Sequence, residues 1–264
     1  MNNFNKRAQE YEAKASIQKI IALDLFKFIK NNNYNLALDL GCGPGVNFLK
    51  LKNYAQNVIG IDLAPNMVKL ANEKAIPQTL ALTLDAHNLS SLPSILANHK
   101  DFLKLDESQI SNFKFDLIYS SLALQWCDFD KILNEITKIS RHKTYITFAI
   151  PTEGTICELK EIFNKVNLNA NFNTFININK IKELLLKHNL TNLKVFEKIY
   201  HDDFYDFKSY LASIREIGAN LSNTKHKSLS KKEYLALINE FNDILKLNKK
   251  LTHSYHITFI YGEI

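Results

Sequence analysis

Residues 36–45 read LALDLGCGPG, an apolar run followed at once by three closely spaced glycines. The run predicts a short strand, and the residues from about Val46 onward predict a helix. The glycines are Gly41, Gly43 and Gly45. Because glycine has no Cβ, such a loop can turn sharply and bring its backbone close to a ligand. A strand, a glycine turn and a helix in this order predict the start of a β-α-β unit.

The chain repeats this alternation in its first half. Four more apolar runs predict strands at 57–62, 79–84, 115–120 and 144–150. A helix is expected at 129–140, and Pro65 suits the first turn of another helix. Strands that alternate with helices predict parallel pairing and a doubly wound α/β sheet.

The other segments predict more helix and a closing strand. Helices are expected at 8–30, 155–167, 177–188, 205–217 and 231–249, and strands at 193–200 and 255–261. The N-terminal helix is expected to end at 31–33. The connection at 87–114 is long for a strand-to-strand link, and 91–105 predicts an extra helix inside it.

The composition is that of an ordinary globular chain, with 46% hydrophobic and 23% charged residues. The formal net charge of +6 favours an acidic partner, and nucleic acid, an acidic protein and a membrane surface all fit this charge. Cys42, Cys127 and Cys157 have no metal-ligand spacing and predict reduced thiols in a cytoplasmic protein. The polar first residues are unlike a signal peptide, and no apolar run is long enough for a membrane span.

Two carboxylates stand at the ends of the first two strands. Asp39 precedes the glycine loop, whose GxGxG spacing is tighter than the GxGxxG of dinucleotide sites. A negative charge there repels a pyrophosphate and suits a cation, and S-adenosylmethionine carries a sulfonium and an ammonium. Asp62, in GIDLA at 60–64, can accept hydrogen bonds from both hydroxyls of a ribose. Taken alone, each feature also fits a plain tight turn or a helix-capping aspartate.

With these motifs, residues 36–150 resemble the class I S-adenosylmethionine-dependent methyltransferases. The resemblance implies a Rossmann-like sheet, mostly parallel with an antiparallel last strand. It also implies S-adenosyl-L-methionine as cofactor, S-adenosyl-L-homocysteine as product, and no metal. Adenine would lie at the end of the third strand, where Asp85 is the candidate carboxylate and 106–107 (Asp-Glu) is the rival. The implied cofactor-binding residues are Asp39, Gly41, Cys42, Gly43, Gly45, Asp62, Leu63, Asp85, Ala86 and Ser120, with Tyr11 and Gln18 on the N-terminal helix.

Several stretches resemble one subfamily, the malonyl-[acyl-carrier protein] O-methyltransferases of biotin synthesis. They are FNKRAQEYEAKASIQ at 4–18, SSLALQWC at 120–127, GTICEL at 154–159, IREIGAN at 214–220 and LTHSYHITFIYG at 251–262. The chain departs from the subfamily in its longer 87–114 connection and in ISRHKTY at 139–145, which replaces a glycine-rich turn. Two alternatives are a methyltransferase-like complex I assembly factor that hydroxylates a protein arginine, and a methyltransferase for another small-molecule acceptor.

The subfamily resemblance implies a single domain over 1–264. Its parts are an N-terminal lid helix at 1–33, a cofactor-binding core at 34–150 and a substrate-covering helical insertion at 205–250. The acceptor would be the free carboxylate of a malonyl thioester, carried by acyl carrier protein through phosphopantetheine or by coenzyme A.

A carboxylate is ionised at neutral pH and needs no general base, so no catalytic acid or base is expected. We expect Gln125, Trp126 and Arg215 to position the acceptor, with the arginine fork suited to its carboxylate. Lysine runs at 225–232 and 246–250 are candidate contacts for the acidic carrier protein. A nucleic-acid substrate is not expected, because no (D/N)PP(Y/W) motif follows the fourth strand, and no membrane partner is expected.

Overall fold

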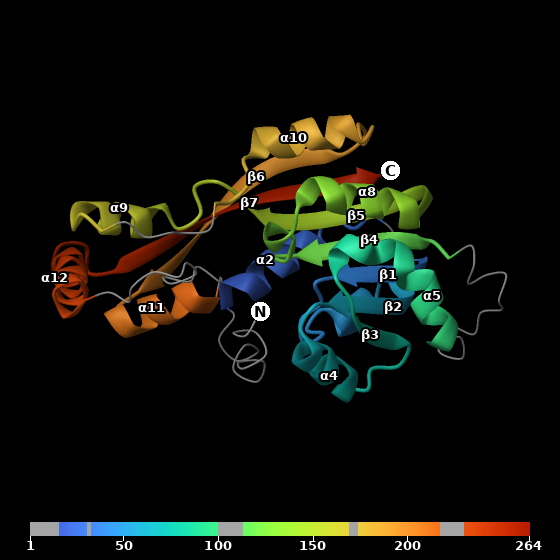
Figure 1. Ribbon diagram of the computed structural model, residues 1–264, viewed down its shortest axis with the longest axis horizontal. Helices are drawn as coiled ribbons and strands as arrows, with labels where there is room; N and C mark the ends of the chain where they lie inside the picture. The colour runs from blue at the N-terminus through green and yellow to red at the C-terminus, as the bar shows by residue number, and fades with distance from the viewer. Residues whose placement is uncertain (1–15, 31–32, 100–112, 169–173, 217–229) are drawn as a thin grey trace. The chain divides into compact units, whose positions relative to one another are not determined.

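The computed structural model describes residues 16–30, 33–99, 113–168, 174–216 and 230–264 (Figure 1). Within them one mixed sheet has the strand order β3-β2-β1-β4-β5-β7-β6. Its strands are β1 (Tyr34–Leu40), β2 (Ala55–Asp62), β3 (Thr79–Thr83), β4 (Phe115–Ser121), β5 (Ser140–Pro151), β6 (Lys194–Phe204) and β7 (Leu251–Glu263). All five strands predicted up to residue 150 are confirmed, with ends that shift by a few residues.

The first five strands are parallel and β7 is antiparallel. Beside β5, the backbone N–H of Ile264 donates to Thr144 and that of Thr152 donates to His256, so the two strands run in opposite directions. The sequence prediction of a mostly parallel sheet with an antiparallel last strand is therefore confirmed.

The centre of the sheet is the place where the chain reverses its direction of winding. From β1 the chain moves outward to β2 and β3, then returns to β4 on the other side of β1. Asp39 is in register with Gly60 of β2 and with Tyr119 of β4. Ligands of open α/β sheets bind at such a switch point, beyond the carboxyl ends of the strands.

Helices connect these strands by crossovers, which are right-handed in nearly all parallel sheets. α3 (Phe48–Leu51) and α4 (Pro65–Glu73) follow β1 and β2, whereas α5 (Leu92–Leu96) and α8 (Phe129–Ile139) lie between β3 and β5 in the chain. Right-handed crossovers put the first pair and the second pair on opposite faces of the sheet. The 3-10 segments η1 (Ala86–Ser91), η2 (Ala97–His99) and η3 (Leu124–Trp126) complete the connections.

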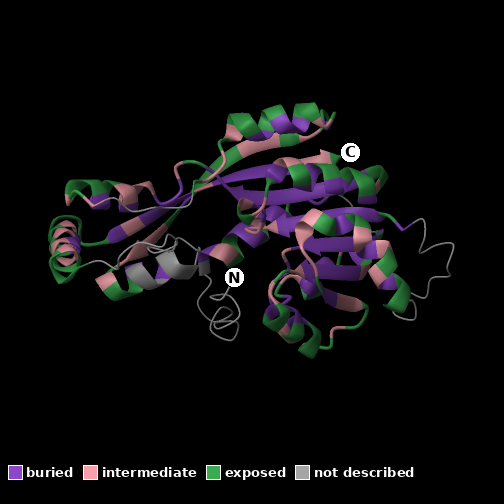
Figure 2. Cartoon of the chain, in the orientation of Figure 1, coloured by how far each residue is buried: buried purple, intermediate pink, exposed green. Residues whose placement is uncertain are grey.

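The core of the sheet lies along its central strands β1 and β4, which are buried along most of their length, whereas the edge strand β6 is mostly exposed or half-buried (Figure 2). Leu38, Ile59 and Ile118 in its central strands are fully buried. Helix α8 turns Ile132, Leu133 and further apolar residues inward and keeps charged residues outward, which is the pattern of a surface helix. α10 (Ile178–Lys187) packs against α8.

The N-terminal helix ends earlier than the sequence predicts. In the described residues α2 runs from Ser16 to Phe26, so the predicted end at 31–33 is wrong. Lys27 and Phe28 form a turn, and the Tyr145 hydroxyl donates to the carbonyl oxygen of Phe28 over 2.6 Å. This tertiary contact takes a carbonyl that a longer helix would use.

The extra helix predicted at 91–105 exists as the short α5. The part of this prediction that falls at 100–105 lies outside the described residues.

The described residues group into two compact units. One holds the residues up to 150 together with 178–197 and 258–264, and the other holds 151–177 and 198–257. The second unit contains α9 (Cys157–Lys165), α11 (Phe207–Glu216) and α12 (Lys231–Asn248), packed around Tyr210 and Phe241. The predicted single domain over 1–264, with a lid at 1–33 and a covering insertion at 205–250, stays a prediction.

None of the described helices is long and apolar enough to cross a membrane.

Candidate functional site

The glycine loop after β1 is left-handed at three positions, with φ of +74° at Gly41, +52° at Gly43 and +70° at Gly45. L-residues with a side chain rarely adopt such angles. A Cβ on Gly41 would overlap the Cβ of Ala123 in the loop after β4, so these two loops touch. A Cβ on Gly43 would meet nothing within 4 Å. Gly43 is thus the point where the loop presents bare backbone to open space.

Asp62 at the end of β2 fastens this loop. Its Oδ2 accepts a hydrogen bond of 2.9 Å from the backbone N of Gly43, and its Oδ1 accepts one of 2.8 Å from the backbone N of Ala64. Burial raises the pKa of Asp62, and the backbone hydrogen bonds from Ala64, Gly43 and Leu63 oppose that rise. The sequence predicts that Asp62 binds a ribose, whereas its hydrogen bond from Gly43 is visible only in the structure.

Asp39 is a carboxylate buried at the end of β1. It is only 1% exposed, and its Oδ2 has no hydrogen-bond partner among the described residues. Burial, and secondarily the charge of Asp62, raise the pKa of Asp39 to about 8. A buried charge is costly unless an opposite charge pairs with it. This end of β1 therefore suits a ligand that brings a positive charge.

Cys42 lies in the same loop, and its thiol is packed in the protein interior. The side chain is 3% exposed, and a Cβ on Gly60 would come within 2.7 Å of its Sγ. Burial raises the pKa of the Cys42 thiol well above its usual value, so the thiol stays protonated and unreactive. Only the backbone of Cys42 is left for a ligand.

A second group of polar residues joins the loops after β3 and β4. Asp85 caps η1, and its Oδ1 accepts hydrogen bonds from the backbone N of His87 (2.9 Å) and from His87 Nδ1 (2.7 Å). The backbone bond from His87, followed by the imidazole contact, lowers the pKa of Asp85. His87 Nε2 accepts from the backbone N of Asp128 over 3.0 Å. The sequence reasoning did not single out His87, although it stands two residues after the candidate acid.

The end of β4 and the segment after it carry Ser120, predicted to meet the cofactor, and Gln125 and Trp126, predicted to position the acceptor. Ser120 is fully buried and its hydroxyl donates to the carbonyl oxygen of Leu40, so its role in this structure is to join β4 to β1. Gln125 donates to the carbonyl oxygen of Leu122, and its Oε1 is buried without a described partner. Trp126 is 42% exposed. Gln125 and Trp126 thus place one polar atom and one partly exposed aromatic ring in the loop after β4, whose Ala123 abuts Gly41.

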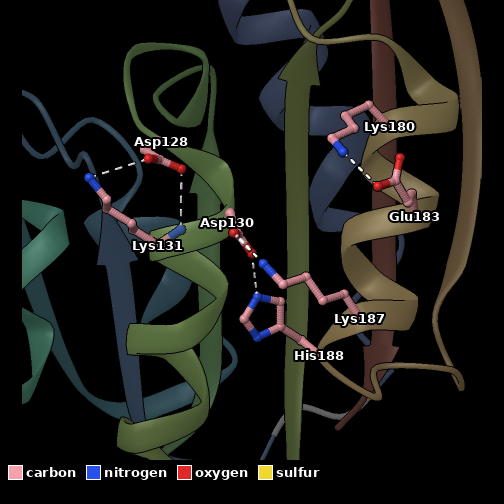
Figure 3. A network of polar contacts seen from close by, with 7 residues as sticks. All are labelled: Asp128, Asp130, Lys131, Lys180, Glu183, Lys187 and His188. Carbon is pink, nitrogen blue, oxygen red and sulfur yellow. Dashed lines mark hydrogen bonds and ion pairs between the residues drawn. The ribbon is translucent and has the colours of Figure 1, made fainter.

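Helix α8 holds this segment in place (Figure 3). Asp128 caps the helix by accepting from the backbone N of Lys131. Two residues later, Asp130 accepts from Lys187 Nζ at 2.6 Å and from His188 Nε2 at 2.7 Å, both at the end of α10. These contacts fix the start of α8, and with it the loop that bears Trp126.

The structure thus brings together the loops after β1, β2, β3 and β4. Leu63 is 47% exposed in the β2 loop, and Ala86 begins η1. Gln18 is half-buried on α2. Tyr11 and the rival acids at 106–107 lie outside the described residues. Arg215 belongs to α11 of the second unit by its backbone, and its side chain is outside what the structure describes.

A central parallel sheet with a glycine turn at the switch point, a buried acid after β1 and a second acid after β2 define the class I methyltransferase fold. The family model described as "Methyltransferase domain" matches residues 38–148. These residues are a class I, S-adenosylmethionine-dependent methyltransferase domain.

Curated relatives resemble the chain well beyond residues 38–148. It is 27% identical to a malonyl-[acyl-carrier protein] O-methyltransferase of Hamiltonella defensa, over 82% of this chain and 75% of that protein. It is 23% identical to the one of Herminiimonas arsenicoxydans, over 99% of this chain and 94% of that protein. Among solved structures, the YcgJ protein of Bacillus subtilis has a TM-score of 0.55 at 15% identity, over 92% of this chain and 97% of that one. The structural likeness supports the fold.

The residues present fit S-adenosylmethionine. The buried Asp39, whose Oδ2 has no partner among the described residues, and the open backbone at Gly43 suit the charged methionine part of the cofactor. No described group of three or more His, Cys, Asp or Glu could hold a metal ion. When bound, the cofactor supplies an electrophilic methyl group on a sulfonium. The assignment of individual residues to parts of the cofactor stays a prediction.

Proposed function

We propose that the protein transfers the methyl group of S-adenosylmethionine to the free carboxylate of a malonyl thioester, as a step in biotin synthesis. The observation that carries this proposal is the extent of the similarity to the curated relatives. It reaches 99% of the chain and so takes in the second half, far beyond the general methyltransferase segment 38–148. The relatives are named for malonyl-[acyl-carrier protein] as the acceptor.

The polar groups of the site support an acceptor that is already ionised. In the loops 41–47, 62–64, 84–88 and 122–128, His87 is the only histidine. Both of its ring nitrogens are engaged, one by Asp85 and the other by the backbone of Asp128. An alcohol or phenol acceptor needs a base to remove its proton, whereas a carboxylate with a pKa of about 4 does not.

The reaction then needs alignment and little else from the protein. A carboxylate oxygen forms a bond to the methyl carbon while the C–S bond breaks and sulfur keeps the electron pair. The sulfonium becomes the neutral thioether of S-adenosylhomocysteine, and the product is a methyl ester. Because two opposite charges cancel, exclusion of water favours the step. Holding the oxygen in line with the C–S bond is the protein's main contribution.

Charge supports an acidic carrier protein as the partner. The net charge is +6, and Lys231, Lys232, Lys246 and Lys249 of the second unit are exposed. Lys246 is paired with Asp243 at 3.0 Å and Lys250 with Asp203 at 2.7 Å, so these two are weaker candidates. Exposed charges act mainly on the rate of encounter and lose effect as salt rises. We expect methylation of the carrier-bound substrate to be more sensitive to salt than methylation of malonyl-coenzyme A.

Mass spectrometry of malonyl-carrier protein after incubation with enzyme and cofactor tests the proposal. We expect a gain of one methyl group on malonyl-carrier protein and no gain on acetyl-carrier protein, which lacks the second carboxylate. Arg215→Ala should lower activity on the malonyl substrate and leave cofactor affinity unchanged, with Lys208→Ala on the same helix as the matched control. Absence of the methyl ester, together with methylation of RNA or hydroxylation of a protein arginine, would contradict the proposal.

A further inference from the structure

His87 joins two loops at the carboxyl end of the sheet. Its Nδ1 lies 2.7 Å from Asp85 Oδ1 after β3, and its Nε2 lies 3.0 Å from the backbone N of Asp128 after β4. A backbone N–H can only donate, so Nε2 must be the unprotonated nitrogen and Nδ1 must carry the hydrogen. His87 is therefore the neutral tautomer that donates from Nδ1 to Asp85.

The contact with His87 engages only one of the two carboxylate oxygens of Asp85. Oδ1 accepts both the imidazole and the backbone N–H of His87. No hydrogen bond joins Oδ2 to any described residue, and the Asp85 side chain is 43% exposed. With Oδ1 held by two donors, rotation of the carboxylate is restricted, and the partly exposed side chain leaves Oδ2 available to a ligand.

We propose that His87 is a positioning residue for the cofactor. It holds Asp85 so that Oδ2 can accept a hydrogen bond from an amino group such as that of adenine, and it ties this acid to the loop at 122–128. The inference rests on the class of the domain and on Asp85 as the adenine acid. It does not depend on which acceptor receives the methyl group.

The segment around His87 has other anchors, so its fold does not rest on the imidazole. The backbone N of Ser90 donates to Glu135 Oε2 of α8 over 2.8 Å, and Glu135 is 6% exposed. Leu89 beside it is fully buried. A change at His87 should therefore alter the direction of Asp85 and leave η1 on α8.

Two substitutions separate the two contacts of the ring. His87→Asn places an amide N–H close to where Nδ1 stands and can keep the bond to Asp85. His87→Gln reaches as far as Nε2 and can keep the bond to Asp128 while it gives up Asp85. His99→Gln, in exposed η2 of the same connection, is the matched control. Circular dichroism and thermal unfolding verify that each variant is folded.

Calorimetry with S-adenosylhomocysteine measures the effect without any acceptor. We expect His87→Gln to bind about 10-fold more weakly, since a hydrogen bond to a charged group is lost. His87→Asn and His99→Gln should bind within about 2-fold of the parent protein, a difference near RT ln 2. In an Asp85→Asn background, His87→Gln should add nothing further.

Equal affinity of the Gln and Asn variants, whether both are weakened or both are normal, would overturn the proposal. So would a full additional loss in the Asp85→Asn background. ¹⁵N NMR of the imidazole in the unaltered protein provides a test that needs no variant. We expect a protonated Nδ1 and an unprotonated Nε2, and the opposite tautomer would overturn the proposal. A failure of the malonyl assay alone would leave all these binding results unchanged.

Discussion

Cofactor binding should release a proton from Asp39, and the apparent affinity should therefore rise with pH. Burial, together with the nearby charge of Asp62, raises the pKa of Asp39 to about 8 in the free protein. At pH 7 only about one tenth of the molecules then carry the ionised carboxylate. The ammonium or sulfonium of the cofactor pairs with the ionised form and must select it.

The magnitude follows from the ionised fraction, since the apparent affinity scales with the population of the competent state. With a pKa of about 8, this fraction grows roughly 25-fold between pH 6 and pH 7.5, and the affinity should grow by the same factor. Measurements stop at pH 7.5 because an α-amino group of the ligand loses its own proton near about 7.7–8.0.

Titration calorimetry in two buffers of different ionisation enthalpy provides the assay, because it reports protons released as well as affinity. The control is Asp39→Asn, which should bind the cofactor weakly and with little dependence on pH. An unaltered protein whose affinity is the same at pH 6 and pH 7.5, with no proton released, would refute the reasoning.

The raised pKa of Asp39 also affects folding stability, which should fall as pH rises, whereas cofactor affinity should rise. A carboxyl whose pKa rises from 3.8 to about 8 on folding favours the folded state most when it is protonated. Its contribution is most favourable below pH 3.8 and declines as pH rises toward 8. Asp39→Asn should therefore stabilise the ligand-free protein at pH 8, by about 5 kcal/mol at most, while it weakens cofactor binding. Urea unfolding at pH 5 and pH 8 measures the difference.

Three further predictions concern contacts that hold the site. Asp62→Asn should weaken S-adenosylmethionine binding about 10-fold or more in calorimetry, because charge-assisted bonds are lost, and unchanged affinity would remove Asp62 from the site. Gly41→Ala should lower the free energy of unfolding more than Gly43→Ala, because a Cβ on Gly41 would overlap Ala123. Gly43→Ala adds only the left-handed strain of about 1–2 kcal/mol. Equal losses in urea unfolding would speak against this packing. Asp130→Ala should lower the melting temperature, because α8 loses its contacts with Lys187 and His188 at the end of α10, and the loss should be smaller at high salt. Lys180→Ala, which removes the exposed pair with Glu183 (Figure 3), should have little effect.

Local pattern was sufficient to predict the first half of the fold. An apolar run that ends in closely spaced glycines, and alternating strand and helix signals up to residue 150, specify parallel β-α-β units through period and turn chemistry alone. The same pattern identified Asp39 and Asp62 as the acids at the ends of β1 and β2, because strand ends are visible in the sequence. Their assignment to particular parts of the cofactor is still a prediction.

Tertiary structure decided what each of these side chains touches. The α2 helix ends at Phe26 because Tyr145, more than a hundred residues away, takes the carbonyl of Phe28. The hydroxyl of Ser120, which is predicted to meet the cofactor, donates a hydrogen bond to the carbonyl oxygen of Leu40 in the neighbouring strand. No sequence motif includes His87, and its contact with the backbone of Asp128 is visible only in the folded structure. Sequence period sets where strands and turns lie, whereas the partners of a polar side chain depend on which distant backbone atoms the packed sheet brings within about 3 Å.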